Sequence, residues 1–207
     1  TFIAATQGFG RKRKFKGWME FSDEEKILTT ARVESPFSIR TALIADEDMI
    51  LFANYNFTFV GAAVNGYLGG STVFLDFNLN GELDFGEPSG LSTSNGGFEI
   101  EVSEEEILAR DQNNNGGLDP SEAMLVVVGG GDHSSRIPLA ISYKSPPGYS
   151  VITAVSTLIA NFTEQGFELS DAEEIVRQYL SLPEEIEFST FEPLREMRND
   201  GELAKEF

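Results

Sequence analysis

Two stretches of the chain carry oxygen-bearing side chains at the spacing that a calcium ion requires. The first, Asp76 to Glu87, reads DFNLNGELDFGE, and the second, Asp111 to Glu122, reads DQNNNGGLDPSE. Both match the EF-hand-type loop pattern D-x-[DN]-x-[DN]-G-x5-E without a mismatch. Ca²⁺ takes about six to eight oxygen ligands, which alternate residues of a tight loop can direct at one point. The sequence therefore predicts two calcium sites.

Corresponding positions of the two loops have the same predicted roles. Positions 1, 3, 5, 9 and 12 offer side-chain oxygens, and position 7 offers its backbone carbonyl. The glycine at position 6, Gly81 or Gly116, permits the sharp turn, and the leucine at position 8, Leu83 or Leu118, is expected to anchor the loop in a core. The candidate metal ligands are Asp76, Asn78, Asn80, Glu82, Asp84 and Glu87 in the first loop, and Asp111, Asn113, Asn115, Gly117, Asp119 and Glu122 in the second.

The overall composition suits a globular protein that binds cations. The 207 residues include 34 acidic and 15 basic ones, and the resulting net charge of −19 argues against nucleic acid as a partner. Without cysteine the fold has no disulfides, so calcium could provide cross-links instead. No apolar stretch approaches the roughly 18 residues of a membrane span. Because the sequence begins at Thr1 without a signal peptide, we expect a piece excised or processed from a longer chain.

The amino-terminal part is predicted to be basic and mostly β. Residues 11–16 hold five of the fifteen Lys and Arg residues. Such a run can be an arm that docks on a polyanion or an anionic lipid, or a strand or arm on this protein's own acidic surface. The acidity of the remaining chain favours the second interpretation. The capping box at 22–25 predicts a short helix to about Ala31, and residues 37–64 predict two or three strands.

The segments that flank the two loops are predicted to differ. Residues 72–76 are β-branched and aromatic, so we expect a strand that leads straight into the first loop and a further strand at 98–102. A capping box at Ser103 predicts a short helix to Arg110 before the second loop, and residues 123–128 predict a buried strand after it. Because a strand enters the first loop, we expect a rigid structural site rather than a hinge that opens on binding.

The carboxyl-terminal part is predicted to become helical after a last strand at 137–143. Thr153 can cap a helix that ends at Gly166, and Ser170 can cap a second one that stops before Pro183. We therefore predict an α+β fold with an antiparallel, β-sandwich-like calcium-binding domain at 1–148, in which 1–20 form the basic arm. A helical unit at 149–207 is expected to pack on that domain.

Catalytic chemistry is not indicated by the residues. The only histidine, His133, lies in Asp132-His133-Ser134-Ser135, but neighbours in sequence cannot readily converge into a nucleophile–base relay. Clustered carboxylates leave a glycosidase pair open, yet metal ligation explains them better. The Asp119-Pro120 bond leaves calcium-dependent self-cleavage open, although Asp119 is itself a predicted ligand. We therefore expect no enzyme.

Several stretches resemble a module of large secreted or surface proteins of bacteria, particularly cyanobacteria. The likeness extends over roughly residues 60–200 and includes VNGYLGGSTVFLD at 64–76, GEP at 86–88, TSNGGF at 93–98, GGGD at 129–132, VITAVSTL at 151–158 and FEPL at 191–194. Where the family usually has Thr-Pro-Leu-Thr-Thr-Leu, this chain has Ala154, Val155 and Ser156 in place of Pro, Leu and Thr. The resemblance implies a calcium-loaded, non-catalytic β-sandwich module with a small helical tail in an extracellular multidomain protein.

The leading hypothesis is a structural module of a secreted or cell-surface protein that two Ca²⁺ ions make rigid. Three alternatives remain open at this point. One is an adhesion module that binds a glycan or a protein through calcium, and another is a calcium sensor, which would need paired helix–loop–helix units. The third is a calcium-dependent self-cleaving or glycosidase domain.

Overall fold

The computed structural model describes the backbone of residues 2–3, 7–8, 11–22, 27–30, 40–41 and 51–195, and the side chains of Lys16 and residues 55–195. The chain forms two compact units. The first comprises Thr1–Thr58 and Glu101–Glu106, and the second comprises Phe59–Ile100 and Ile107–Phe207. The boundary that we predicted at residue 148 falls inside the second unit, so it does not separate these two units.

The first unit is built on antiparallel strands. Strand β3 pairs with β2, β4 and β6, with a bulge between Phe15 and Gly17, and β1 pairs with β5. Strand β6 continues into the second unit, where its end pairs in parallel with β14. The bounds are β1 (Phe2–Ile3), β2 (Gln7–Gly8), β3 (Arg11–Ser22), β4 (Ile27–Thr30), β5 (Arg40–Thr41) and β6 (Leu51–Ala63).

Two predictions for this unit have different outcomes. The basic run at 11–16 lies on β3, where Lys16 forms an ion pair with Glu101 at 3.1 Å, and the docking of the whole run on the protein's own acidic surface stays a prediction. The helix predicted from residue 22 to Ala31 is wrong, because residues 27–30 form β4. Ile27 and Thr30 are β-branched, and pairing with β3 overrides the local capping signal.

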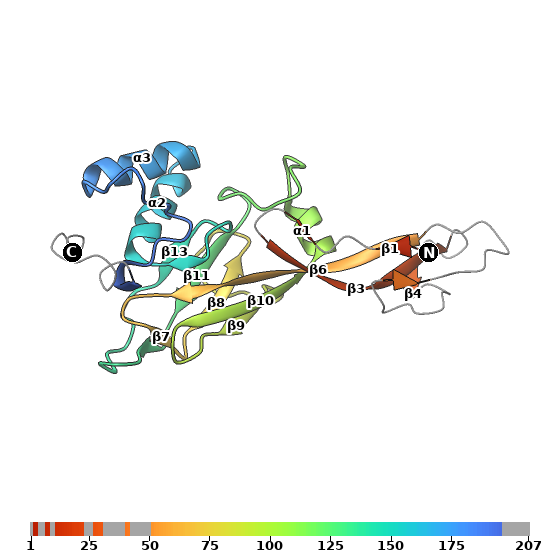
Figure 1. Cartoon of the computed structure of the whole chain (residues 1–207), viewed down its shortest axis with the longest axis horizontal. Helices are drawn as coiled ribbons and strands as arrows, with labels where there is room; N and C mark the ends of the chain where they lie inside the picture. Colours follow the sequence, from red (N-terminus) through yellow and green to blue (C-terminus); the bar gives the residue numbers. More distant parts are fainter. Residues whose placement is uncertain are drawn as a thin grey trace. The chain divides into compact units, whose positions relative to one another are not determined.

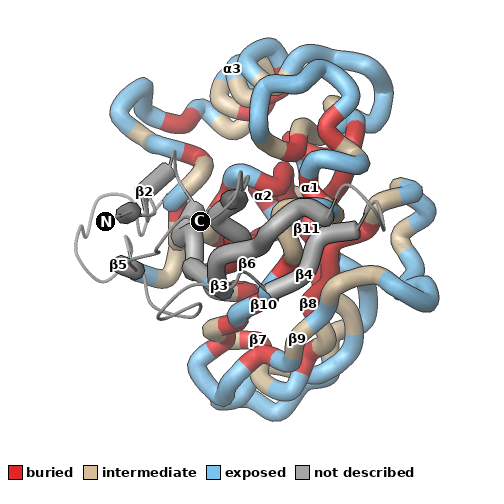
Figure 2. The backbone as a smooth tube through the Cα atoms, turned by 90° about the vertical axis from the view of Figure 1, so that its right-hand side faces the viewer, coloured by how far each residue is buried: buried red, intermediate tan, exposed pale blue. Residues whose placement is uncertain are grey.

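The second unit contains a sheet in which every neighbouring pair is antiparallel, in the order β13-β11-β8-β9. The central strands β8 and β11 are buried throughout most of their length (Figure 2), as their continuous apolar sequences predict. The bounds are β7 (Leu68–Gly69), β8 (Thr72–Asp76), β9 (Ser89–Leu91), β10 (Gly97–Ser103), β11 (Met124–Val128), β12 (Gly131–Asp132), β13 (Tyr143–Ser145) and β14 (Val151–Ile152).

The described residues form three helices, of which the first two begin at side-chain caps: α1 (Glu104–Arg110), α2 (Ala154–Glu164) and α3 (Leu169–Tyr179). Ser103 and Glu106 form the predicted capping box of α1. Thr153 caps α2 reciprocally with Ser156, and Gly166, at φ 92°, follows its last turn. Helix α3 begins after Glu168, two residues earlier than the predicted cap at Ser170.

Helix α2 contacts β13, and α3 packs on α2 (Figure 1). Phe74 and Met124 of the sheet pack with Ala160 of α2. A second cluster joins the helices to the segment after them, with Ile159 and Val176 buried beside Phe188. Leu158 of α2 and Tyr179 of α3 are 37% and 81% exposed and lie outside these clusters. The sheet thus supports the helices, and its central strands lead directly to the two predicted loops.

The predicted α+β class is confirmed, whereas the sandwich-like arrangement stays a prediction. The strand predicted at 137–143 is wrong over most of its length, because only Tyr143 belongs to a strand, β13. Gly129 and Gly130 turn the chain at positive φ, and Pro138 cannot donate a ladder hydrogen bond.

Among the described residues, none of the helices has the length and apolar character needed to cross a lipid bilayer.

Candidate metal-binding loops

The two predicted calcium loops occupy different connections in the second unit. The first loop, residues 76–87, joins β8 to β9, and the backbone N–H of Leu75 donates to the carbonyl of Pro88 at 3.0 Å to close its base. The second loop, residues 111–122, joins α1 to β11. The first loop is therefore held between two strands, and the second is held between a helix and a strand.

The position-1 carboxylates are held in the same way in both loops. Asp76 Oδ1 accepts from the backbone N–H of Asn80 at 3.3 Å, and its Oδ2 accepts from Gly81 at 2.6 Å. Asp111 accepts from Asn115 and Gly116 at 3.0 and 2.7 Å. In both loops the residues at positions 4 and 6 are left-handed, with φ of 60° and 77° at Leu79 and Gly81, and 58° and 80° at Asn114 and Gly116. The turn that brings the loop ends together is thus built twice.

The position-12 glutamates fasten the end of each loop to its beginning. Glu87 Oε1 accepts from the backbone N–H of Phe77 at 2.8 Å, and Oε2 accepts from Asp84 at 3.0 Å. Glu122 accepts from Gln112 at 2.6 Å and from Asp119 at 2.9 Å. In each loop, then, both oxygens of the last carboxylate face backbone donors at positions 2 and 9.

The position-9 carboxylates accept hydrogen bonds from asparagine amides. Asp84 Oδ2 accepts from Nδ2 of Asn78 and Asn80 at 2.8 and 2.7 Å, and these bonds hold the pKa of Asp84 below its usual value. In the second loop, Asp119 Oδ2 accepts from Asn113 and Asn115 at 2.6 and 2.8 Å. All the side chains predicted as ligands at positions 1, 3, 5, 9 and 12 are therefore linked within their own loops.

The chemistry of this donor set suits a hard cation. Each loop offers carboxylate and amide oxygens and contains neither sulfur nor imidazole. Ca²⁺ prefers such oxygen ligands. Among the described residues, no three carboxylate, imidazole or thiol groups gather closely enough to hold a metal by themselves. The predicted set also uses two asparagine oxygens and a backbone carbonyl from each loop, and an amide can rotate its oxygen toward an ion.

The loops differ in how deeply they are anchored. Leu118 is 4% exposed, so its predicted anchoring role is confirmed, whereas Leu83 is 44% exposed and that prediction is wrong. The first loop is already held by a strand at each end, so its position 8 need not reach a core. The terminal carboxylates of the second loop are both buried; in the first loop only Asp76 is buried.

A contact between the loops is not evident from the sequence pattern. The guanidinium of Arg110, directly before the second loop, lies 3.8 Å from the ring centroid of Phe77 in the first loop. Its Nε is buried and has no hydrogen-bond partner among the described residues. From the sequence, the basic residue in the last turn of α1 predicts only a favourable charge at the carboxyl end of the helix. It does not predict a contact with the first loop.

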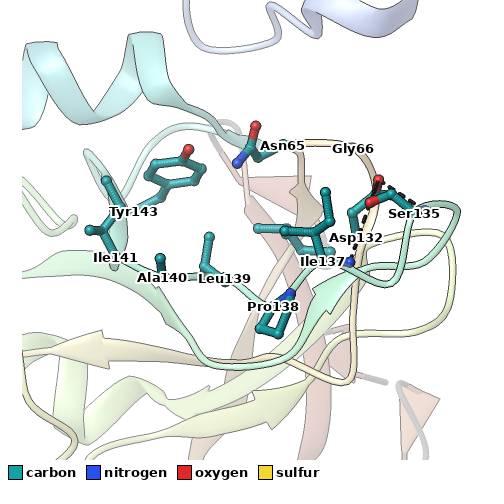
Figure 3. Close-up of a pocket in the computed structure, with 11 residues that line it drawn as sticks. Asn65, Gly66, Asp132, Ser135, Ile137, Pro138, Leu139, Ala140, Ile141 and Tyr143 are labelled. Carbon is teal, nitrogen blue, oxygen red and sulfur yellow. Dashed lines mark hydrogen bonds between the residues drawn. The ribbon is translucent and has the colours of Figure 1, made fainter.

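The serine–histidine–aspartate sequence forms a polar turn. The hydroxyls of Ser134 and Ser135 donate directly to Asp132, and these bonds lower the pKa of Asp132 to about 2. The turn borders a cavity of ≈ 420 Å³ that Leu139 and Tyr143 also line (Figure 3). Because the hydroxyls bond to the carboxylate without an intervening imidazole, they do not form a nucleophile–histidine–aspartate chain.

A second cavity lies beside the second loop. It has a volume of ≈ 390 Å³ and is lined by Asn113 and Asp119 of the loop and by Thr163, Phe167 and Glu168 near the α2–α3 corner. Phe167 is 44% exposed, and its ring packs edge-to-face on Phe162 with centroids 5.7 Å apart. The cavity therefore combines an exposed, supported aromatic ring with two of the predicted calcium ligands.

No protein-family model matches the chain, and no curated protein or solved structure is significantly similar to it. The resemblance to bacterial surface modules therefore stays a prediction from the sequence.

Proposed function

We propose that this chain is a non-catalytic structural calcium-binding module with one Ca²⁺ in each loop. The observation that supports this most is the repetition, position by position, of the hydrogen bonds and left-handed residues in two loops with different neighbours. One loop lies in a hairpin and the other follows a helix. The loop geometry therefore follows from the shared sequence pattern, whose spacing of oxygens is that of a calcium ligand set.

The proposed mechanism is electrostatic. Each loop carries three carboxylates among its twelve residues, Asp76, Asp84 and Glu87 in the first and Asp111, Asp119 and Glu122 in the second. Without a cation these charges repel each other, and the backbone and amide donors offset that repulsion only in part. A bound Ca²⁺ would replace repulsion by attraction and link position 1 to position 12. It would thereby fix β8 relative to β9 and α1 relative to β11.

Ion binding to the folded form alone also stabilises that form. One site contributes about 2.7 kcal/mol when free calcium is a hundred times Kd. The high net negative charge of the chain, −19, adds a general attraction for cations. We therefore propose that calcium acts as the cross-link of a protein that has no cysteine.

The resemblance to bacterial surface modules supplies the proposed setting. In that setting the chain is a β-sandwich-like module within a longer secreted or cell-surface protein, with neighbouring domains as its covalent partners. Extracellular calcium modules often bind at about 10⁻⁴–10⁻³ M. Sites of that affinity would fill outside a cell and give the module its stiffness there.

The direct test combines native mass spectrometry with thermal unfolding, in calcium, in magnesium and in chelator. Two bound Ca²⁺ and a higher Tm in calcium are expected. The double variant Asp76→Asn, Glu87→Gln should lose one ion, because the two substitutions keep the side-chain shapes but remove both negative charges from the first loop. A wild-type mass without calcium, together with the same Tm in calcium and chelator, would contradict the proposal.

A second candidate function, calcium-dependent adhesion to a glycan, is favoured by the cavity beside the second loop. Position 9 of such loops often reaches the ion through a water molecule, so a sugar hydroxyl could replace that water near Asp119. The exposed ring of Phe167 offers a flat apolar surface for a sugar ring, and Asn113 and Glu168 add polar partners.

Glycan arrays in calcium and in chelator test this second candidate. Calcium-dependent binding that Phe167→Ala abolishes and Phe85→Ala leaves intact would support it. Phe85 is a matched control because it is fully exposed on the first loop and does not line the cavity. Absence of binding to every glycan in calcium would reject it and leave the structural role unaffected.

A further inference from the structure

We infer that the two loops form one coupled pair, in which an ion in the second loop raises the affinity of the first through Asp76 and Phe77. The inference rests on the proposed function and adds how its two sites regulate each other. The supporting observations are two contacts, one from each end of the second loop, to Asp76 and Phe77 at the beginning of the first loop.

The first contact comes from the end of the second loop. Strand β11 begins at Met124, two residues after Glu122, and Met124 lies opposite Asp76 in the antiparallel β8–β11 register. Asp76 is the position-1 ligand of the first loop and is fully buried. The strand that leaves the second loop therefore holds the backbone of a predicted ligand in the first.

The second contact comes from the beginning of the second loop. Arg110 precedes the position-1 ligand Asp111, and its guanidinium lies 3.8 Å from the ring centroid of Phe77. A cation this close to an aromatic face is attracted to it, and burial strengthens the attraction. The backbone N–H of Phe77 in turn donates to Glu87 Oε1 at 2.8 Å, so this contact also reaches the position-12 ligand of the first loop.

The two contacts together give the coupling a mechanical basis. An ion in the second loop would join Asp111 to Glu122 and so restrict the distance between Arg110, directly before the loop, and Met124, two residues after it. These are the residues that hold Phe77 and Asp76. Ordering them before the first ion binds there removes part of the entropy that this binding would otherwise lose.

The difference in burial sets the order of filling. In the second loop Asp111, Glu122 and the anchor Leu118 are 6%, 5% and 4% exposed, whereas Asp84 and Leu83 of the first loop are exposed. The second loop therefore has more of its ligand and anchor side chains held in the core than the first, where Asp76 alone is buried, and we expect it to fill first. Linkage is reciprocal, so an ion in the first loop must strengthen binding at the second by the same factor.

The repulsion between two bound dications opposes this coupling. Salt screens that repulsion beyond a Debye length of about 8 Å at 0.15 M ionic strength, whereas the contacts through Asp76 and Phe77 depend little on salt. We therefore expect a coupling factor above one at physiological ionic strength. This factor should fall as the salt concentration is lowered.

Calorimetric calcium titration of the whole chain measures the coupling factor. The Asp111→Asn, Glu122→Gln variant gives the association constant of the first loop alone, and the Asp76→Asn, Glu87→Gln variant gives that of the second. The product of the two wild-type constants should exceed the product of these two values by about tenfold, within the usual range for coupled sites. A ratio of one, or below one, overturns the inference while leaving both ions bound.

Arg110→Met isolates the contact with Phe77. It should lower the coupling factor, because only the contact through Asp76 remains, while each single-loop constant changes less than about twofold. Arg136→Met, which removes the same charge from an exposed residue outside both loops, should leave the factor unchanged. If Arg110→Met lowers the Tm in chelator enough to prevent folding, Phe77→Leu replaces it. An unchanged coupling factor in the folded variant overturns the role of Arg110.

Failure of the proposed function gives a different result. In that case wild-type protein shows no calcium binding heat and no ion by native mass spectrometry. A coupling factor of one requires two measured binding events, so the two failures cannot be confused.

Discussion

The two loops have the same sequence pattern and the same internal hydrogen bonds, but they differ in what holds them. The first is the connection of a hairpin and keeps Leu83 and Phe85 exposed, at 44% and 108%. The second lies between α1 and β11 and buries Leu118. Twelve residues thus suffice to specify the hydrogen bonds and the left-handed turns of a loop, whereas the anchoring of the loop depends on the elements around it.

The difference in anchoring has a consequence for the empty loops. Buried groups of the second loop remain held by the core when no ion is present, whereas the first loop relies on its strand ends and its own hydrogen bonds. Local opening needs less free energy where few apolar contacts are lost. We therefore expect hydrogen exchange in chelator to be faster in residues 78–86 than in residues 113–121.

A large effect, which depends on calcium, is expected from disabling one loop at a time. Asp111→Asn with Glu122→Gln should lower the free energy of unfolding in calcium by about 2.7 kcal/mol at a hundred times Kd, and by more if the first loop also loses affinity. Asp76→Asn with Glu87→Gln should remove the smaller contribution of the first loop together with the same coupling free energy, because linkage is reciprocal. Chemical unfolding in calcium measures both variants, and equal losses would contradict the difference between the loops.

Truncation of the position-8 leucines is the next test. Leu118→Ala should cost about 2–5 kcal/mol in calcium and in chelator, because it leaves a cavity in the core. Leu83→Ala removes an exposed side chain, and the expected change lies within about 0.5 kcal/mol. Urea unfolding curves give both values. A large loss for Leu83→Ala would show that the first loop is anchored after all.

The turn glycines provide a test in which the loops should behave alike. Gly81 and Gly116 have φ of 77° and 80°, a region that costs a residue with a Cβ about 1–2 kcal/mol. Gly81→Ala and Gly116→Ala should therefore lower stability by similar amounts and weaken calcium binding in their own loops. Calorimetry and thermal unfolding measure the two variants side by side, and a marked inequality would mean that the turns are not equivalent.

The smallest expected effect concerns an acidic turn that needs no metal. The pKa of Asp132 is lowered to about 2 by the hydroxyls of Ser135 and Ser134, so its folded value lies below its unfolded one, about 3.9. The stability that it contributes is present above pH 4 and is lost as the pH falls toward 2. Ser135→Ala should reduce that acid-dependent loss of Tm equally in calcium and in chelator. A difference between the two conditions would link this turn to the metal-binding loops.

Short-range chemistry explains which features could be predicted from the sequence. The capping box at Ser103, the cap at Thr153 and the turns at Gly81 and Gly116 depend on neighbours within a few residues, and each forms as expected. The apolar run of β11 could be predicted because only a buried strand satisfies so many β-branched residues in succession.

The features that could not be predicted depend on distant partners. The capping signal after Ser22 is overridden because β4 pairs with β3, and the exposure of Leu83 depends on β9 closing the hairpin. The contact between Arg110 and Phe77 joins residues 33 positions apart whose proximity follows from the pairing of β8 with β11. A local pattern does not contain these tertiary relations.

Diffraction from crystals grown in millimolar CaCl₂ tests the central claim most directly. Anomalous difference maps should show one Ca²⁺ in each loop, with about six to eight oxygen ligands at roughly 2.3–2.6 Å, from positions 1, 3, 5, 7 and 12 and, directly or through a water molecule, position 9. Maps that show only water in both loops would contradict the claim that calcium rigidifies this protein.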